Sequence, residues 1–210
     1  MTSLVLDIAS SAIFDRYMYI HVARGLSHVG GFYCTGGAED DSPADSSGYG
    51  GHCLAGTYCP MGSSAPVACD PGYYCASDHL SNTSGLCDGG YYCYASNVYP
   101  NPSESNVTGN PCPLGAYCPP GSASPTQCQS GYYLNSTHND DVSDCLLCTP
   151  GMYCAGSGNE VPDGYCDAGW YCPGGQDDPR PEGLNCTLGK FISCKCFITP
   201  SVWPYKAAPI

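Results

Sequence analysis

Most of the chain lacks the side chains that build an ordinary protein core. Between residues 31 and 189 the 210-residue sequence contains no isoleucine and no lysine, and only 15 of those 159 residues are Leu, Val or Phe. This shortage excludes a conventional aliphatic core, because a chain so poor in apolar side chains stays disordered unless something else holds it. No stretch approaches the ~20 apolar residues of a membrane helix, so we expect no membrane insertion by this segment.

Basic residues are scarce as well. The formal net charge is −13, and between residues 31 and 189 there are 17 acidic residues and one basic residue, Arg180. Nucleic acid and anionic membrane surfaces would be repelled, so we expect neither as a partner. The acidic clusters at residues 39–41, 140–141 and 177–178 match no calcium-loop signature and are interpreted as solvated charge.

The sequence offers no catalytic or metal-binding constellation. The five histidines are scattered, with no serine elbow or histidine pair. His52 and Cys53 could form a Cys–His site, but a bridged cysteine beside an exposed histidine is the simpler interpretation. Zinc modules need paired Cys-x-x-Cys knuckles, and within the repeats only Cys145 and Cys148 have that spacing. We therefore expect no enzyme activity, no metal and no cofactor.

Cysteine is what the sequence has in abundance. Of its 18 cysteines, 16 lie between residues 31 and 189. Disulfides, at roughly 2 to 4 kcal/mol each, would supply the stabilisation that the absent core cannot. Because cross-links at this density survive only outside the reducing cytosol, we expect an extracellular or cell-surface protein.

The cysteines follow a repeated motif, Cys-x-x-Gly-x-Tyr-Cys. Six segments match it in full: CLAGTYC (53–59), CDPGYYC (69–75), CDGGYYC (87–93), CPLGAYC (112–118), CTPGMYC (148–154) and CDAGWYC (166–172). A seventh, CQSGYYL (128–134), ends in Leu134, and Cys145 follows it as the apparent displaced partner. Repeats that start 16 to 25 residues apart predict an array whose members contact mainly their neighbours.

The letters of the motif have physical reasons. Six residues of extended chain span about 20 Å, whereas disulfide-bonded Cα atoms lie roughly 4.4 to 6.8 Å apart, so a bridge across the motif demands a chain reversal. The glycine supplies the positive φ of a tight turn, and the tyrosine ring is expected to lie against the disulfide with its hydroxyl in water. The segments between successive motifs are rich in Pro, Gly and Ser and are expected to be loops. The predicted fold is therefore an elongated array of small disulfide-rich repeats, made of stapled turns and short two-stranded ribbons with little or no helix.

The sequence is compatible with two regular schemes of cysteine pairing. Within-repeat pairing joins Cys53–Cys59, Cys69–Cys75, Cys87–Cys93, Cys112–Cys118, Cys128–Cys145, Cys148–Cys154 and Cys166–Cys172, and it leaves Cys34 and Cys186 over. Between-repeat pairing joins Cys34–Cys53, Cys59–Cys69, Cys75–Cys87, Cys93–Cys112, Cys118–Cys128, Cys145–Cys148, Cys154–Cys166 and Cys172–Cys186. The second scheme leaves none over but forces a strained Cys-Leu-Leu-Cys ring, which favours the first.

Several segments resemble the ephrin-receptor-like cysteine-rich repeats, in the neighbourhood of growth-factor-like and tumour-necrosis-factor-receptor modules. They are SDCLLCTPGMY (143–153), PVACDPGYY (66–74) and GSASPTQC (121–128). The resemblance covers residues 31 to 189. The array is similar to those in protist and algal surface proteins, including mastigoneme components. It implies a spacer or stalk, and it implies a bridge from Cys128 to Cys145. No kinase or ligand-binding domain accompanies the array, so receptor function does not carry over.

Four Asn-x-Ser/Thr sequons predict N-glycosylation, at Asn82, Asn106, Asn135 and Asn185. Residues 1–30 and 190–210 form atypical flanks that hold all six isoleucines. Both borders cut a repeat in half, with His28 where a cysteine is due and Gly189 followed by Lys190-Phe191. We interpret the flanks as translated intron around a 31–189 array; genuine termini are the alternative.

These observations predict an extracellular structural or spacer segment of a larger glycosylated cell-surface, matrix or fibril protein. Its partners would be neighbouring repeats or copies of a surface or fibril protein. The alternative is a receptor-type module that binds a protein or sugar through exposed tyrosines. Such a module needs a departure from repetition, and the candidates are the long insert at residues 94–111 and the variant repeat around Leu134.

Overall fold

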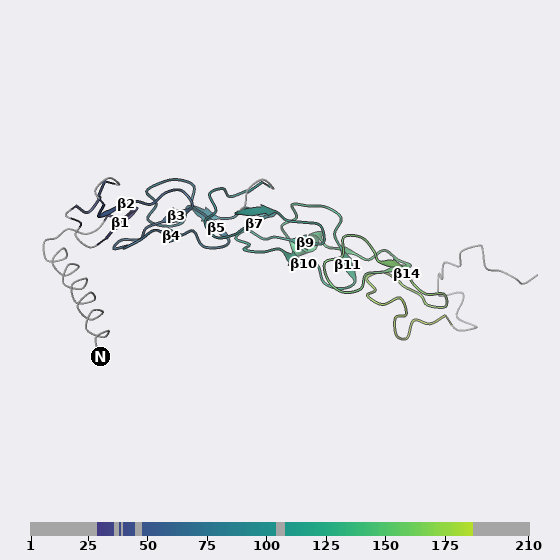
Figure 1. Cartoon of the computed structure of the whole chain (residues 1–210). Helices are drawn as coiled ribbons and strands as arrows, with labels where there is room; N and C mark the ends of the chain where they lie inside the picture. The colour runs from purple at the N-terminus through teal and green to yellow at the C-terminus, as the bar shows by residue number, and fades with distance from the viewer. Residues whose placement is uncertain (1–28, 36–37, 39, 45–47, 104–107, 187–210) are drawn as a thin grey trace, which may run out of the picture. The chain divides into compact units, whose positions relative to one another are not determined.

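The computed structural model describes residues 29–35, 38, 40–44, 48–103 and 108–186 (Figure 1). The predicted flanks, 1–30 and 190–210, lie outside these residues except for Val29 and Gly30. Chain contacts define two compact units. The first comprises Met1–Pro111 with Pro119–Ser124, and the second comprises Cys112–Cys118 with Pro125–Ile210.

The first unit contains four two-stranded antiparallel ribbons among its described residues. They pair β1 (Phe32–Cys34) with β2 (Gly50–His52), β3 (Thr57–Tyr58) with β4 (Val67–Ala68), β5 (Tyr73–Tyr74) with β6 (Gly85–Leu86), and β7 (Tyr91–Cys93) with β8 (Gly109–Pro111). Each ribbon is a hairpin between one motif and the residues just before the next motif.

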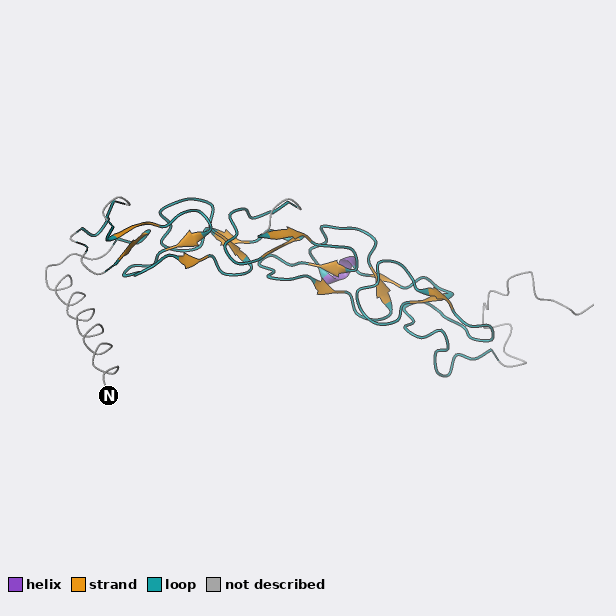
Figure 2. Cartoon of the chain, in the orientation of Figure 1, coloured by secondary structure: helices purple, strands orange, loops and turns teal. Residues whose placement is uncertain are grey.

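The second unit repeats the same plan. It pairs β9 (Ala116–Tyr117) with β10 (Thr126–Gln127), β11 (Tyr132–Tyr133) with β12 (Leu146–Leu147), and β13 (Met152–Tyr153) with β14 (Gly164–Tyr165). A 3-10 turn, η2 (Val142–Asp144), is the one helical element in the described residues, and Figure 2 shows it beside short strands and long loops. The prediction of small disulfide-rich repeats with short ribbons and little helix is confirmed.

Each ribbon begins at the glycine of a motif. The N–H of the fifth motif residue donates to the carbonyl of the second, as from Thr57 to Leu54 at 2.9 Å and from Tyr73 to Asp70 at 3.0 Å. The glycine between them has positive φ, for example 84° at Gly72. A four-residue turn with positive φ at its third residue is a type II turn, which glycine satisfies without strain. The turn brings the two ends of the motif together.

The buried residues are mostly cysteines. The two cysteines of every complete motif from Cys53 to Cys154 are at most 1% exposed, and few aliphatic side chains join them. Leu134, at 2% exposure, is the largest of these and lies in the variant repeat. Buried sulfur thus replaces the aliphatic core that the composition excludes.

Candidate functional site

Seven disulfides join the cysteines in the within-repeat arrangement. They are Cys53–Cys59, Cys69–Cys75, Cys87–Cys93, Cys112–Cys118, Cys128–Cys145, Cys148–Cys154 and Cys166–Cys172, with Cα–Cα distances of 5.8 to 6.5 Å. Cys186 is also disulfide-bonded. Cys34 is a half-buried free thiol, and burial together with the nearby Asp41 carboxylate raises its pKa. A thiol with a raised pKa is less often the reactive thiolate.

The variant repeat keeps the hydrogen bonds of the other repeats, although its disulfide joins a more distant cysteine and a leucine replaces the closing cysteine. Cys145 reaches Cys128 from 17 residues away, across the loop that contains η2. Leu134 stands where the closing cysteine would be, and its carbonyl still accepts the N–H of Gly115 at 2.8 Å. Leu134 packs with the Cys128–Cys145 bridge, and the rings of Tyr117 and Tyr132 cover this cluster.

Successive repeats within each unit are joined by a recurring set of backbone hydrogen bonds. The motif glycine donates its N–H to the carbonyl of the closing residue of the next repeat, at 2.8 or 2.9 Å. The pairs are Gly31 to Cys59, Gly56 to Cys75, Gly72 to Cys93, Gly115 to Leu134, Gly131 to Cys154 and Gly151 to Cys172. The glycine carbonyl accepts the N–H of the first cysteine of the next repeat, as from Cys87 to Gly72 at 2.9 Å.

A second left-handed residue lies three or four positions after each closing residue. Its N–H donates to the carbonyl of the first cysteine of the preceding repeat. These residues, with their φ values, are His79 (61°), Ser96 (61°), Gly121 (83°), His138 (65°), Gly158 (77°) and Gly175 (68°). The next carbonyl in the loop accepts the N–H of the preceding repeat's closing residue, as Asn97 does from Cys75 at 2.8 Å. We call the residue that supplies this carbonyl, such as Asn97, the loop acceptor of its repeat.

The motif glycine is required for space as well as for φ. A Cβ at Gly56 would lie 2.8 Å from the carbonyl oxygen of Ser96, and one at Gly131 would lie 2.5 Å from that of Gly175. Gly31, Gly72 and Gly115 have equally close backbone neighbours, under 3.0 Å, in the loops of His79, Gly121 and Gly158. In each case the carbonyl belongs to the left-handed residue two repeats further on. Sequence reasoning found the turn but missed this contact between backbones.

The motif tyrosines are half-buried and reach toward the next repeat. The hydroxyl of Tyr58 donates to Asp70, 3.2 Å away and beside the first cysteine of the following motif. Burial and this hydrogen bond raise the pKa of Tyr58. Tyr117 covers the Cys128–Cys145 bridge of the next repeat. The expected contact between tyrosine and disulfide is therefore made there with the following repeat's bridge.

The long insert after Cys93 has a copy in the same unit. The segments 35–49 and 94–108 follow equivalent strands, β1 and β7, and their described residues correspond at a constant offset in numbering. Pro43 and Pro102 pack against Gly50 and Gly109, where a Cβ would lie 2.8 and 2.6 Å from the proline ring. Thr35 donates to Tyr49 and Tyr94 to Thr108, at 2.8 and 2.7 Å.

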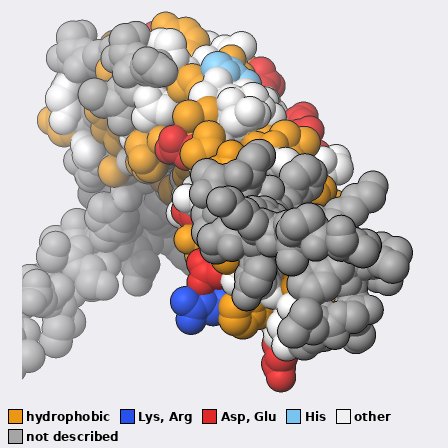
Figure 3. Space-filling model, turned by 90° about the vertical axis from the view of Figure 1, so that its right-hand side faces the viewer, with side chains coloured by type: hydrophobic (Ala, Val, Ile, Leu, Met, Phe, Trp, Pro, Cys, Tyr) orange, Lys and Arg blue, Asp and Glu red, His pale blue; other side chains and the backbone are white. Residues whose placement is uncertain are grey.

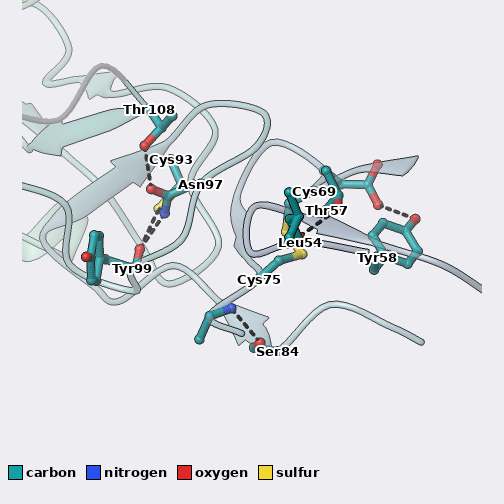
Figure 4. The surroundings of a disulfide bond; sticks show 12 residues. Leu54, Thr57, Tyr58, Cys69, Cys75, Ser84, Cys93, Asn97, Tyr99 and Thr108 are labelled. Atoms are coloured by element: carbon teal, nitrogen blue, oxygen red, sulfur yellow. Dashed lines mark hydrogen bonds between the residues drawn. A yellow bond between two sulfur atoms is a disulfide. The ribbon is translucent and has the colours of Figure 1, made fainter. Parts of the chain in front are cut away.

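A buried position differs between the two inserts. Where the first has the buried Ala38, the second has Asn97, which is 0% exposed. Figure 4 shows the Asn97 amide between the Tyr99 carbonyl, to which it donates, and the Thr108 hydroxyl, which donates to it at 2.9 Å. The same amide contacts the sulfur of Cys93 at 2.9 Å. Asn97 therefore ties the insert to a disulfide, with every polar atom of its side chain satisfied.

Three of the four predicted glycosylation sites lie in the described part of the chain. Asn82, Asn135 and Asn185 are exposed, and Asn106 falls outside the described residues. The exposed asparagines are accessible to a modifying enzyme, and a glycan there would extend into solvent.

The residues considered for catalysis or metal binding have other roles. Cys53 is in a buried disulfide, and Cys145 and Cys148 belong to two different bridges. Within residues 29–186, as far as they are described, no three His, Cys, Asp or Glu side chains converge as metal ligands. Among the same residues, no helix has both the length and the apolar character needed to cross a membrane.

The charge of the array is acidic with one local exception. The Arg180 guanidinium pairs with Asp167 and lies over the Trp170 ring, 5.7 Å from its centre. Figure 3 shows basic atoms in blue beside acidic side chains in red, on a face that also carries hydrophobic side chains in orange. The contact to Asp167 raises the pKa of Arg180, so the guanidinium stays positively charged at physiological pH.

Fold and site together define a protein of small disulfide-rich repeats, of the kind that persists in oxidising compartments outside the cytosol. No family model matches the chain, and no curated protein matches it.

Proposed function

We propose that the chain is an extracellular structural or spacer segment of a larger glycosylated cell-surface, matrix or fibril protein. The resemblance to ephrin-receptor-like repeats is part of this proposal. A spacer needs stability without a large core, resistance to unfolding in an oxidising environment, and a surface that stays soluble. Buried disulfides, repeat-to-repeat hydrogen bonds and the excess of acidic residues supply these properties.

The observation that carries the proposal is that both candidate departures from repetition follow the repeating scheme. The described residues of the insert at 94–111 share with those of 35–52 the packing of a proline on a glycine and the backbone hydrogen bond that follows the closing cysteine. The variant repeat around Leu134 keeps the same hydrogen bonds to its neighbours. A receptor-type module would be expected to hold its specificity in a region that breaks the pattern, so the geometry favours a structural role over the alternative.

The compartment is tested by producing the chain behind a eukaryotic secretion signal. We expect a secreted protein in which the seven described disulfides have formed. It should carry N-glycans at the predicted sites Asn82, Asn106, Asn135 and Asn185. Accumulation of a reduced, unglycosylated chain that folds in the cytosol would contradict the proposal.

The role is tested by a loop replacement. Residues 94–108 are replaced by residues 60–66, which form the short linker after Cys59. This linker keeps the essential contact, because the Ser63 carbonyl accepts the N–H of Cys34 at 3.0 Å just as the Asn97 carbonyl accepts that of Cys75. The control exchanges residues 60–66 for the similar linker 119–125.

A spacer predicts that both variants are secreted as well as the unmodified chain and protect the same amide hydrogens in the neighbouring repeats. The receptor alternative predicts a different result. Binding of the unmodified chain to an extracellular-matrix extract or a glycan array, lost in the 94–108 replacement and kept in the control, would favour it.

A further inference from the structure

The residue that precedes the first cysteine of a repeat lies against the left-handed residue in the loop of the next repeat. Leu86 lies against Gly121 in this way, and a Cβ at Gly121 would be 2.9 Å from the leucine side chain. The same arrangement recurs in two further pairs, Gln127 with Gly158 and Leu147 with Gly175. In all three pairs a large side chain lies against a glycine, so one partner of each pair is small.

The first pair in the chain departs from this rule, because both partners are histidines. His52 precedes Cys53, and His79 is the left-handed residue (φ 61°) in the loop after Cys75. Since neither partner is small, the imidazole rings stack, with centroids 4.4 Å apart and planes inclined by 8°. Phe32, the cross-strand partner of His52, packs edge-on against His79 at 5.1 Å. Among the pairs at this position that the structure describes, it is the one in which both side chains can take up a proton.

The stack lies at a junction of three repeats. The His79 N–H donates to the Cys53 carbonyl, and Leu80, the loop acceptor of its repeat, accepts the Cys59 N–H, both at 2.7 Å. The His79 carbonyl oxygen also lies so close to Gly31 that a Cβ there would be 2.3 Å from it. Lifting this loop from the ribbon of β1 and β2 would break both hydrogen bonds and end the close backbone contact.

The described contacts place one carboxylate beside the stack. The Asp78 Oδ2 lies 3.8 Å from the His52 Nε2, and the other oxygen of Asp78 accepts the Ala55 N–H at 2.8 Å. Phe32 carries no charge, and Tyr33 lies on the opposite face of β1 because side chains alternate along a strand. Asp78 can therefore balance one positive charge in the stack but not two.

Two charged imidazoles at this separation repel each other. The repulsion is only partly screened by water, because the His52 side chain is 21% exposed. Histidine is the side chain whose charge ordinarily changes between about pH 5 and pH 8. In an open loop the two rings are separate and hydrated, so the open state binds more protons than the closed state. A fall in pH therefore favours opening.

We propose that the stack of His52 and His79 is an acid-sensitive joint in the array. At neutral pH the stack holds the loop after Cys75 on the first ribbon. In an acidic compartment both rings take up protons, repel each other and release the loop, while the covalent bridges stay closed. The first junction then becomes flexible without unfolding of the repeats. Such a joint adds to the spacer role a stiffness that depends on the compartment.

Hydrogen exchange of the full oxidised chain tests the joint, with rates expressed as protection factors so that the effect of pH on the exchange chemistry cancels. We expect the protection of the Cys59 and His79 amides to fall about tenfold between about pH 7.5 and about pH 5.5. The amides of Cys118 and His138 make the equivalent hydrogen bonds in the second unit, at 2.9 and 3.0 Å. Their protection should stay the same.

The matched variants are His79→Asn and His138→Asn. Both residues are left-handed, with φ of 61° and 65°, and asparagine adopts this conformation more readily than most residues. The first cysteine of the preceding repeat follows His52 in one case and Pro111 in the other. We therefore expect His79→Asn to abolish the pH dependence at Cys59 and His138→Asn to keep it. His52→Phe leaves a ring against His79 that cannot be charged, and it should abolish the pH dependence even if His79→Asn misfolds.

Three results would overturn the inference. They are protection at Cys59 that does not change with pH in the unmodified chain, an equal loss at Cys118, and a pH dependence that persists in both His79→Asn and His52→Phe. None of these results bears on the spacer proposal, whose test is secretion of the chain with its disulfides and glycans.

Discussion

Two glycines of the first unit separate the effect of backbone crowding from that of backbone strain. Gly62 and Gly72 both have φ 84°. A Cβ at Gly62 would meet nothing within 4 Å, whereas a Cβ at Gly72 would lie under 3.0 Å from the Gly121 carbonyl oxygen. Replacing either by alanine costs about 1 to 2 kcal/mol of left-handed strain. Only Gly72→Ala also forces the two backbones apart.

The additional cost follows from the bonds at that contact. Gly72 donates to Cys93, and Gly121 donates to Cys87, each at 2.9 Å. If the shift breaks both, at about 1 kcal/mol net for each hydrogen bond, Gly72→Ala loses about 2 kcal/mol more than Gly62→Ala. Local opening would then be about 30-fold more frequent.

Native-state hydrogen exchange of the oxidised protein measures this directly, because it reports the opening of individual amides. The amides of Gly72, Cys87 and Gly121 should exchange about 30-fold faster in Gly72→Ala than in Gly62→Ala. Equal exchange rates in the two variants would refute the claim that the motif glycine is needed for close packing between repeats.

Three further predictions follow from particular residues. Mild reduction should open Cys166–Cys172 first, because Cys166 is half-exposed whereas the cysteines of the complete motifs before it are buried, and timed alkylation with mass spectrometry detects the order; simultaneous opening of all bridges would contradict this. Asn97→Ala should destabilise the insert by about 1 to 3 kcal/mol, since it leaves the buried partners of the amide unsatisfied, and urea denaturation of the oxidised protein measures it; an unchanged midpoint would count against the role given to Asn97. The Ser143 N–H donates to Asp141 and lowers its pKa, so the turn that Asp141 caps should be stable above the ordinary aspartate range and should loosen as pH falls through the lowered pKa; an NMR titration in which the Asp141 carboxyl titrates at or above the ordinary aspartate value would contradict this.

The sequence was sufficient to predict the repeat and its internal geometry. Cysteines six residues apart can be bridged only across a reversal, and glycine is the residue that allows that reversal. The ribbons follow because the chain must return to start the next motif. The displaced bridge from Cys128 to Cys145 was implied by the family resemblance. All of these features depend on residues close together in sequence.

The contacts between repeats could not be predicted in the same way, because backbone groups make them and almost any side chain can accompany them. Left-handed conformations occur at His79, Ser96 and His138, and these residue types do not predict such a conformation. Their shared position after the closing residue was the available signal, visible once Gly121, Gly158 and Gly175 are aligned with them.

The duplicated insert was also missed. Cys34, Pro43 and Gly50 match Cys93, Pro102 and Gly109 at a constant offset, yet few other residues of the two segments agree. The proline and glycine are kept together because the ring packs on the glycine Cα. The rest of each insert is exposed enough to vary, so similarity by letters is low although the backbone plan is the same.

The central claim is that bridges inside each repeat hold this chain in shape. Mass spectrometry of the non-reduced protein after proteolysis tests it most directly. The account predicts linked peptides for Cys53–Cys59, Cys69–Cys75 and the other within-repeat pairs, with Cys128 joined to Cys145. Peptides that join Cys59 to Cys69 and Cys145 to Cys148, or free thiols throughout a protein that stays folded in strong reductant, would contradict it.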